Sequence, residues 1–141
     1  ITALYADDNV SIKNKEVTSN ILKAIGKVIW VDNEGKMDAV TALSGSGPAY
    51  VFMFISAFIE AGQKIGLTKS EAESLAYTTL HGSTLLSEDN LDDLDTLIKN
   101  VTSKGGTTEQ GIKTLNDNNF KEIILLATEA AFNRAKEIGS E

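Results

Sequence analysis

The stretch "PAYVFMFISAFIEAGQKI", residues 48–65, decides which fold the sequence allows. Large apolar side chains follow one another without interruption from Val51 to Ile55, so they occupy every side of a helix. A helix that is apolar all round has to be covered on every side. In a helical unit of roughly a hundred residues, a partner chain is a natural way to cover it. Gly62 and Gly66 are expected to end the helix.

The residues before this helix predict how it begins. Pro48 suits the first helical position, since its fixed φ fits a helix and a first-turn N–H has no helical partner. Ser46 or Gly47 would then be the N-cap, and "KMDAVTAL", residues 36–43, would lead into the cap.

The first 35 residues follow a different pattern. "ITALYA" and "KVIWV" read as short strands, and "NKEVTSNILKAIG" between them reads as a helix closed by Gly26. A single β-α-β unit cannot cover both faces of a parallel sheet. Because the chain also begins at Ile1 without an initiator methionine, we expect residues 1–35 to come from a larger α/β domain.

The rest of the chain is expected to be helical. Thr68 with Glu71 and Asn119 with Glu122 have the spacing of two capping boxes, each of which starts a helix. The sequence therefore predicts a mainly α protein, a helical bundle preceded by a β-α-β unit. The expected helices after the apolar one cover residues 67–87, 88–100, 107–117 and 119–139.

Composition excludes several kinds of function. A net charge of −7 argues against a broad nucleic-acid or anionic-membrane surface. The chain has no cysteine, which is compatible with a reducing cytoplasm, and its single histidine, His81, cannot form a multi-histidine metal site. No metal site is expected, and the acidic cluster at 88–95 reads as a solvated helix start. The apolar stretch between Pro48 and Glu60 is shorter than the roughly 20 residues that cross a bilayer.

The segment "NVTSKGGTTEQGI", residues 100–112, joins two of the expected helices. Its glycines and hydroxyls precede a helix start, where free N–H groups and the helix dipole attract anions. A small carboxylate or a phosphate could bind there. The alternative is structural: Gly105 and Gly106 make the turn, and the hydroxyl of Thr107 or Thr108 caps the next helix.

Four segments together resemble the C-terminal half of pyrroline-5-carboxylate reductase. They are "AVTALSGSGPAY" at 39–50, "GLTKSEAESLA" at 66–76, "NVTSKGGTTEQGIKTL" at 100–115 and "NFKEIILLATEAAFNRAKEIG" at 119–139. The resemblance implies an enzyme that reduces L-1-pyrroline-5-carboxylate to L-proline with NADPH or NADH, in cytoplasmic proline synthesis. It also implies an intertwined homodimer, in some members assembled further, with no nucleic acid or membrane as partner.

The same resemblance implies the domain organisation. Residues 1–35 would be the C-terminal remnant of a Rossmann-type dinucleotide-binding domain, and residues 36–141 an all-α dimerisation and substrate-binding domain. The fingerprint G-x-G-x-x-G is not in these residues. The isolated chain is therefore expected to be inactive, and which of the two cofactors is preferred cannot be read from it.

Site residues follow from the resemblance by position. The Thr108 hydroxyl would hydrogen-bond the ring nitrogen of the substrate and relay a proton to it. The other substrate-binding residues would be Val101, Ser103, Gly105, Gly106 and Thr107. Residues near the nicotinamide end of the cofactor would be Thr41, Ser46, Gly47, Pro48 and Asn100; for Thr41 and Asn100, hydrogen bonding at the helix surface or C-cap is the alternative.

Two other interpretations stay open. The fold could serve a related reductase that acts on another imine or keto acid, because the loop would accept any small carboxylate. It could also be a purely structural dimerisation module, in which Thr108 affects stability alone.

One position departs from the family pattern, which usually has proline where Lys104 stands. Lysine gives up the stiffness of proline and brings a positive charge near the expected carboxylate. We predict that Lys104→Pro raises the KM for substrate at low salt and flattens the salt dependence of KM, as measured over a salt series. An unchanged salt dependence would contradict an electrostatic role.

Overall fold

The computed structural model describes residues 1–89 and 93–140, and it divides into two compact units. One unit comprises Ile1–Pro48 with Leu125–Glu141, and the other comprises Ala49–Ile124.

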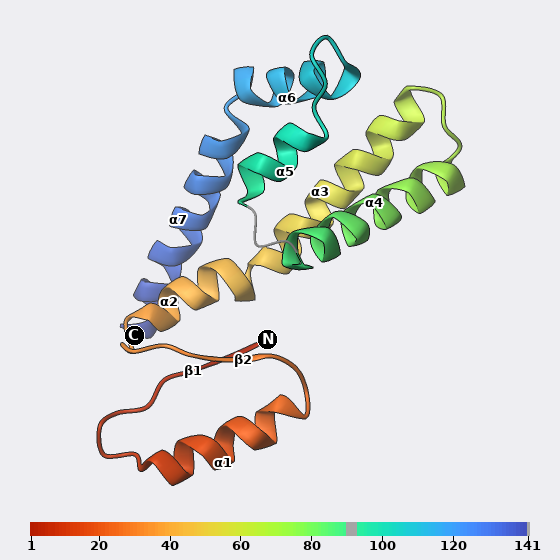
Figure 1. Cartoon of the computed structure of the whole chain (residues 1–141). Helices are drawn as coiled ribbons and strands as arrows, with labels where there is room; N and C mark the ends of the chain where they lie inside the picture. Colours follow the sequence, from red (N-terminus) through yellow and green to blue (C-terminus); the bar gives the residue numbers. More distant parts are fainter. Residues whose placement is uncertain (90–92, 141) are drawn as a thin grey trace. The chain divides into compact units, whose positions relative to one another are not determined.

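The first unit opens with the β-α-β element that the sequence predicts (Figure 1). Strand β1 (Thr2–Leu4) and strand β2 (Val28–Trp30) pair in parallel, and helix α1 (Ile12–Lys23) connects them. Gly26 closes the helix with φ 147°, a backbone conformation that only glycine adopts readily.

Trp30 ends β2, and 40% of the residue is exposed. Its ring nitrogen donates a hydrogen bond of 2.9 Å to the Ser19 hydroxyl on α1. Ile29 is also 43% exposed. Both faces of a parallel sheet are normally covered, so these residues leave the sheet with uncovered apolar surface.

A continuous helical run follows, and it overturns the predicted start of the apolar helix. Helix α2 (Lys36–Val40) passes through a π-helical turn, η1 (Thr41–Gly45), into α3 (Gly47–Lys64). Ser46 keeps helical angles, φ −84° and ψ −27°, and its N–H donates to the Thr41 carbonyl at 2.9 Å. Neither Ser46 nor Gly47 is therefore an N-cap.

Pro48 supplies a physical reason for this turn. Proline has no N–H to donate to the carbonyl four residues back, and its ring crowds that carbonyl. A π turn is wider than an α turn, so it relieves the crowding while the backbone stays helical.

The apolar stretch is predicted to be too short to cross a membrane because its helix is expected to begin at Pro48. This prediction is wrong, because the helix begins before Pro48. In the part of the chain that the structure describes, the run Lys36–Lys64 has 29 residues and is the one helix long and apolar enough to cross a membrane. Length and composition alone do not separate such a span from the core helix of a soluble assembly.

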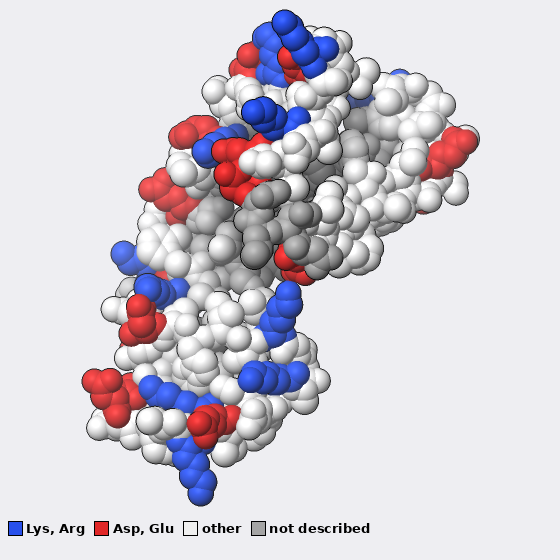
Figure 2. Space-filling view, in the orientation of Figure 1, with Lys and Arg blue, Asp and Glu red and all other residues white. Residues whose placement is uncertain are grey.

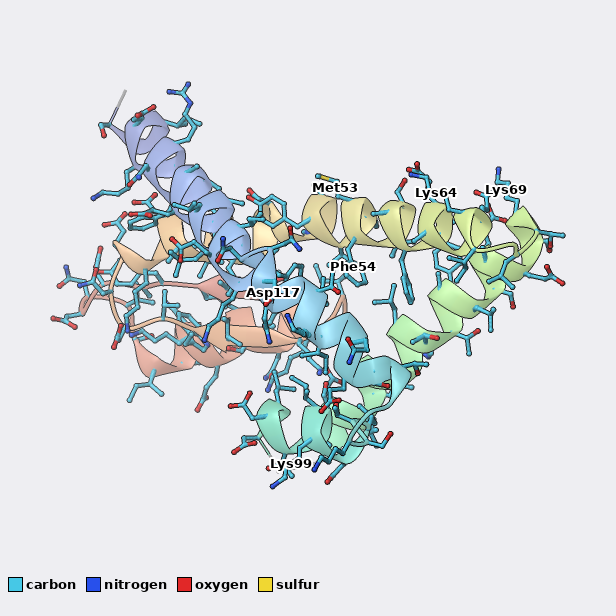
Figure 3. The ribbon with its side chains drawn as sticks, turned by 90° about the horizontal axis from the view of Figure 1, so that it is seen from above. Met53, Phe54, Lys64, Lys69, Lys99 and Asp117 are labelled. Carbon is cyan, nitrogen blue, oxygen red and sulfur yellow. The ribbon has the colours of Figure 1, made fainter. Side chains whose placement is uncertain are left out.

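Helix α3 is apolar all round, as predicted, yet none of its residues is buried within the chain. Met53 and Phe54 project in different directions from it (Figure 3), and they are 77% and 41% exposed. The visible face of the α3–α4 region carries few charged side chains (Figure 2). The predicted burial of this helix is therefore not provided by the unit to which most of it belongs.

Helix α4 (Lys69–Asp89) packs beside α3 through small residues. A Cβ added to Gly62 would lie 3.1 Å from the Cβ of Ala72, so the two backbones approach closely at this point. Ala72 and Ala76 are buried there.

The predicted capping box at the start of α4 is confirmed. The Thr68 hydroxyl and N–H donate to the Glu71 carboxylate at 2.7 and 2.8 Å, and the Glu71 N–H donates back to the hydroxyl at 3.3 Å. The Thr68 hydroxyl, followed by its N–H, lowers the pKa of Glu71 below its usual value.

Three helices complete the chain: α5 (Leu94–Asn100), α6 (Thr107–Asp117) and α7 (Phe120–Gly139). Asp93, from the predicted acidic cluster, caps α5 by accepting the Thr96 N–H at 2.7 Å. This backbone N–H is the main cause of its lowered pKa. Asp92, from the same cluster, lies outside the described residues.

The second predicted capping box does not form. Asn119 has φ 57°, whereas an N-cap residue has an extended backbone. The residue takes the left-handed conformation that asparagine tolerates, between the end of α6 and the start of α7.

The capping box at Thr68 predicts a pH-dependent contribution to stability. Because the pKa of Glu71 is lowered in the folded state, its contribution is present above the usual value of 4.5 and is lost as the pH falls through the folded value. Thr68→Ala should lower the melting temperature at pH 7 by about 2–4 °C. The difference from the parent should shrink in acid.

Thr79→Ala, on the exposed surface of the same helix, is the control. Melting curves of both variants from pH 7 to pH 3 would measure the effect. A Thr68→Ala difference that stays constant with pH would rule out the Glu71 contribution.

Candidate functional site

The loop between α5 and α6 is held to the end of α5 by Thr102. Its hydroxyl donates to the Ile98 carbonyl at 2.6 Å, and its N–H donates to the Lys99 carbonyl at 3.1 Å. Thr102 is partly buried, whereas Val101 is 64% exposed at the C-cap. Figure 3 labels Lys99 on α5 and Asp117 on α6, the helices on either side of the loop.

The next four residues form a tight turn. The Gly106 N–H donates to the Ser103 carbonyl at 3.0 Å, and Gly105 has φ 74°. Lys104 does not have a positive φ, so the positive angle falls at the third position alone, as in a type II turn. Gly105 is therefore required by conformation.

Gly106 is required by packing. A Cβ added to it would lie 2.3 Å from the Ser103 hydroxyl oxygen and 3.0 Å from the Ser103 carbonyl oxygen. A larger residue at position 106 would therefore require the Ser103 hydroxyl to rotate away and the Ser103 carbonyl to shift.

The start of α6 has no side-chain cap. Gly106 is the N-cap, with φ −82° and ψ 170°, and the hydroxyls of Thr107 and Thr108 do not cap the helix. Among residues 1–89 and 93–140, no group accepts a hydrogen bond from the N–H of Thr107 or Thr108. These N–H groups and the two exposed hydroxyls form an open set of donors at the positive end of a helix dipole.

A carboxylate of the chain itself lies at the same loop. Glu109, in the first turn of α6, accepts the Gly105 N–H at 2.8 Å. The Gly105 N–H therefore already has a hydrogen-bond acceptor. Gly105 remains a predicted substrate-binding residue, but its N–H is not free in this structure.

The sequence did not indicate the hydrogen bonds by which Thr102 and Glu109 hold this loop. Glu109 stands three residues after the N-cap, the position at which a glutamate reaches back to the residues before a helix, and this spacing could have revealed it. Thr102 is a hydroxyl residue at a helix end, and its bond to the carbonyl four residues back carries no distinctive spacing signal.

The predicted cofactor residues fall into both units. Asn100 ends α5 beside the loop and is exposed. Ser46, Gly47 and Pro48 stand at the junction of η1 and α3 in the first unit. A Cβ on Gly47 would meet no atom within 4 Å, so the chain's own packing does not explain this glycine.

Thr41 begins the π turn, and its hydroxyl donates to the Met37 carbonyl at 2.9 Å. This is the helix-surface bonding named above as the alternative to a cofactor role. Thr41 also lines a mostly apolar pocket of about 460 Å³ between the start of β1, Ile29 and the π turn.

His81 is exposed on α4. Within the described ranges, no group of three or more histidine, aspartate or glutamate side chains could hold a metal ion.

Comparison with known proteins identifies relatives along nearly all of the chain. Residues 34–138 match the family described as "Pyrroline-5-carboxylate reductase dimerisation". Pyrroline-5-carboxylate reductase of Pseudomonas aeruginosa is 37% identical over 140 residues, which are 99% of this chain and 51% of the relative. Pyrroline-5-carboxylate reductase 2 of Bacillus subtilis is 42% identical over 118 residues, 84% of this chain and 42% of the relative.

Solved structures show the same similarity. A pyrroline-5-carboxylate reductase from Coxiella burnetii superposes with a TM-score of 0.91 at 42% identity, over 96% of this chain and 50% of that one. The Plasmodium falciparum enzyme, with NADP bound, superposes with a TM-score of 0.89 at 33% identity, over 97% and 53%. The chain thus spans about half the length of the relatives that it matches.

The packing at Gly106 predicts that Gly106→Ala loosens the loop, because the new methyl group displaces the Ser103 hydroxyl and crowds the Ser103 carbonyl. Hydrogen exchange of a peptide spanning residues 102–110 should become faster. Gly111→Ala is a matched control, since a Cβ there meets nothing within 4 Å and alanine is favoured inside helices. Equal exchange in Gly106→Ala and the parent would contradict the packing role of Gly106.

Proposed function

We propose that this chain, which belongs to the pyrroline-5-carboxylate reductase dimerisation family, is part of an oxidoreductase that converts L-1-pyrroline-5-carboxylate to L-proline with NADPH or NADH. The observation that carries the proposal is the uncapped start of α6, where the N–H groups of Thr107 and Thr108 face outward beside two hydroxyls.

The substrate is a five-membered ring with one carboxylate, and this donor set suits that group. Backbone N–H groups at a helix start bind anions through hydrogen bonds and the helix dipole together. We place the carboxylate at Thr107 and Thr108, next to Ser103 and Gly106. The exposed Lys104 adds a positive charge to the approach.

Thr108 is our candidate for the catalytic residue. Its hydroxyl can both donate and accept a hydrogen bond, so it can hold the ring nitrogen in place and pass a proton to it. Val101, with 64% of its surface exposed beside the loop, would contact the apolar carbons of the ring.

The residues at the junction of η1 and α3 fit the approach of a flat ring, because the open space at Gly47 leaves its backbone accessible. Ser46, Gly47 and Pro48 would hold the nicotinamide end of the cofactor, with Thr41 and Asn100 as further candidates. When bound, the cofactor supplies the hydride. We expect its other parts to be held by a dinucleotide-binding domain to which residues 1–35 belong, with residues 36–141 as the dimerisation and substrate domain.

The partner that we propose for α3 is a second copy of this chain. Its apolar surface needs cover, and the family that matches residues 34–138 is a dimerisation family. A dimer supplies that cover without a membrane. We therefore also propose a cytoplasmic protein, whose dimers could assemble further.

The enzymatic proposal predicts the outcome of one assay. The complete protein that carries residues 1–141 should oxidise NADPH or NADH only when pyrroline-5-carboxylate is present. Thr108→Ala should lower kcat by about 10²–10⁴-fold, as expected for loss of a general acid, while Thr108→Ser keeps most of the activity.

Light scattering on the same samples should show an unchanged oligomeric state in Thr108→Ala. Full activity in this variant would remove Thr108 from the mechanism. No turnover of the parent with either cofactor would favour another imine or keto acid, or a structural role for the chain.

The dimer proposal makes a separate prediction. Phe52 is 68% exposed on α3, so Phe52→Glu would cost little in a monomer. In a dimer it buries a charge, and we expect monomers or aggregates by size-exclusion chromatography with light scattering. Gln63→Glu, which adds the same charge near the end of α3, is the control. An unchanged dimer in Phe52→Glu would show that this face is not the interface.

A further inference from the structure

We propose that Glu109 is a positioning residue for substrate binding, acting through its hydrogen bond to the Gly105 N–H and not through its charge. The inference rests on the proposed function, since it assigns the loop between α5 and α6 to the substrate carboxylate. Glu109 itself is not expected to touch the substrate.

The loop needs restraint at its centre. It is a type II turn in which Lys104 holds the second position, where proline would fix the backbone. Lysine leaves that position free to rotate, and Gly105, which follows it, is the most flexible residue type. Two adjacent flexible positions therefore precede the free N–H groups at the start of α6.

The hydrogen bonds of the described residues restrain the loop at both ends. At its start, the Thr102 hydroxyl holds it to the Ile98 carbonyl of α5 at 2.6 Å. At its end, the partly buried Glu109 reaches back from α6 to the Gly105 N–H at 2.8 Å. The Gly106 N–H closes the turn on the Ser103 carbonyl at 3.0 Å, and the bond of Glu109 ties the peptide between Lys104 and Gly105 to the helix that begins with the free N–H groups.

The charge of Glu109 cannot be what helps an anion to bind. A carboxylate beside an anion site repels a second carboxylate. Its benefit to substrate binding must then come from the acceptor oxygen, which keeps the turn closed. A glutamine keeps an acceptor oxygen at the same place without the charge, and an alanine removes both.

Comparing Glu109→Ala with Glu109→Gln therefore separates the effect of the hydrogen bond from the effect of the charge. In the complete protein carrying residues 1–141, Glu109→Ala should raise the KM for pyrroline-5-carboxylate about three- to tenfold, the effect of one modest hydrogen bond. Its kcat should change little, because Thr108 is intact. Glu109→Gln should have a KM equal to or below that of the parent.

A second pair of variants tests the restraint directly. Adding Lys104→Pro to Glu109→Ala should return the KM most of the way to that of Lys104→Pro alone, because proline replaces the lost restraint. Adding Lys104→Gln should not, although it removes the same charge. Hydrogen exchange of a peptide spanning residues 102–110, corrected for the amide that proline lacks, should be faster in Glu109→Ala than in the parent. Adding Lys104→Pro should slow the exchange again, and adding Lys104→Gln should not.

The outcomes are distinct. A parent protein without turnover would contradict the proposed function, while hydrogen exchange would still test the restraint by Glu109. An active parent in which Glu109→Ala changes neither KM nor exchange overturns the inference. So does a Glu109→Gln variant as impaired as Glu109→Ala, since it would assign the effect to charge.

Discussion

The uncovered apolar surface of α3 is the constraint on which the rest of this structure depends. A helix that presents aromatic and aliphatic side chains in every direction gains little from its own chain, where the close contact with α4 is made by Gly62 and Ala72. Most of the hydrophobic free energy of this helix is available only on association. In the dimer that we propose, folding and assembly would be parts of the same process.

The sequence predicts the elements well where local chemistry determines them. The two strands and α1 follow from hydrophobic periodicity, the start of α4 from Thr68 with Glu71, and the start of α6 from the two glycines before it. Each of these depends on residues within a few positions of one another.

The features that the sequence did not predict have two physical origins. The π turn arises because Pro48 removes a donor while the flanking residues still favour helix, and no periodicity signals that compromise. Asn119, which precedes α7, has the spacing of a capping box, but its backbone is left-handed. Within the candidate site, the sequence predicted the loop and its glycines. It did not place Glu109, whose role depends on a side chain that reaches back across the turn.

The π turn has a consequence for comparing the two helices that it joins. An α-helix rotates by about 100° for each residue, and a π turn contains about one residue more than an α turn. The side chains of α3 are therefore rotated by about that angle from where the α2 spiral would carry them. Deleting one residue between Thr41 and Gly45 would remove the residue that the wider turn adds, so the backbone would become a regular α-helix and the α3 surface would keep its present facing. A one-residue deletion within α3 itself would instead rotate every later side chain by about 100°.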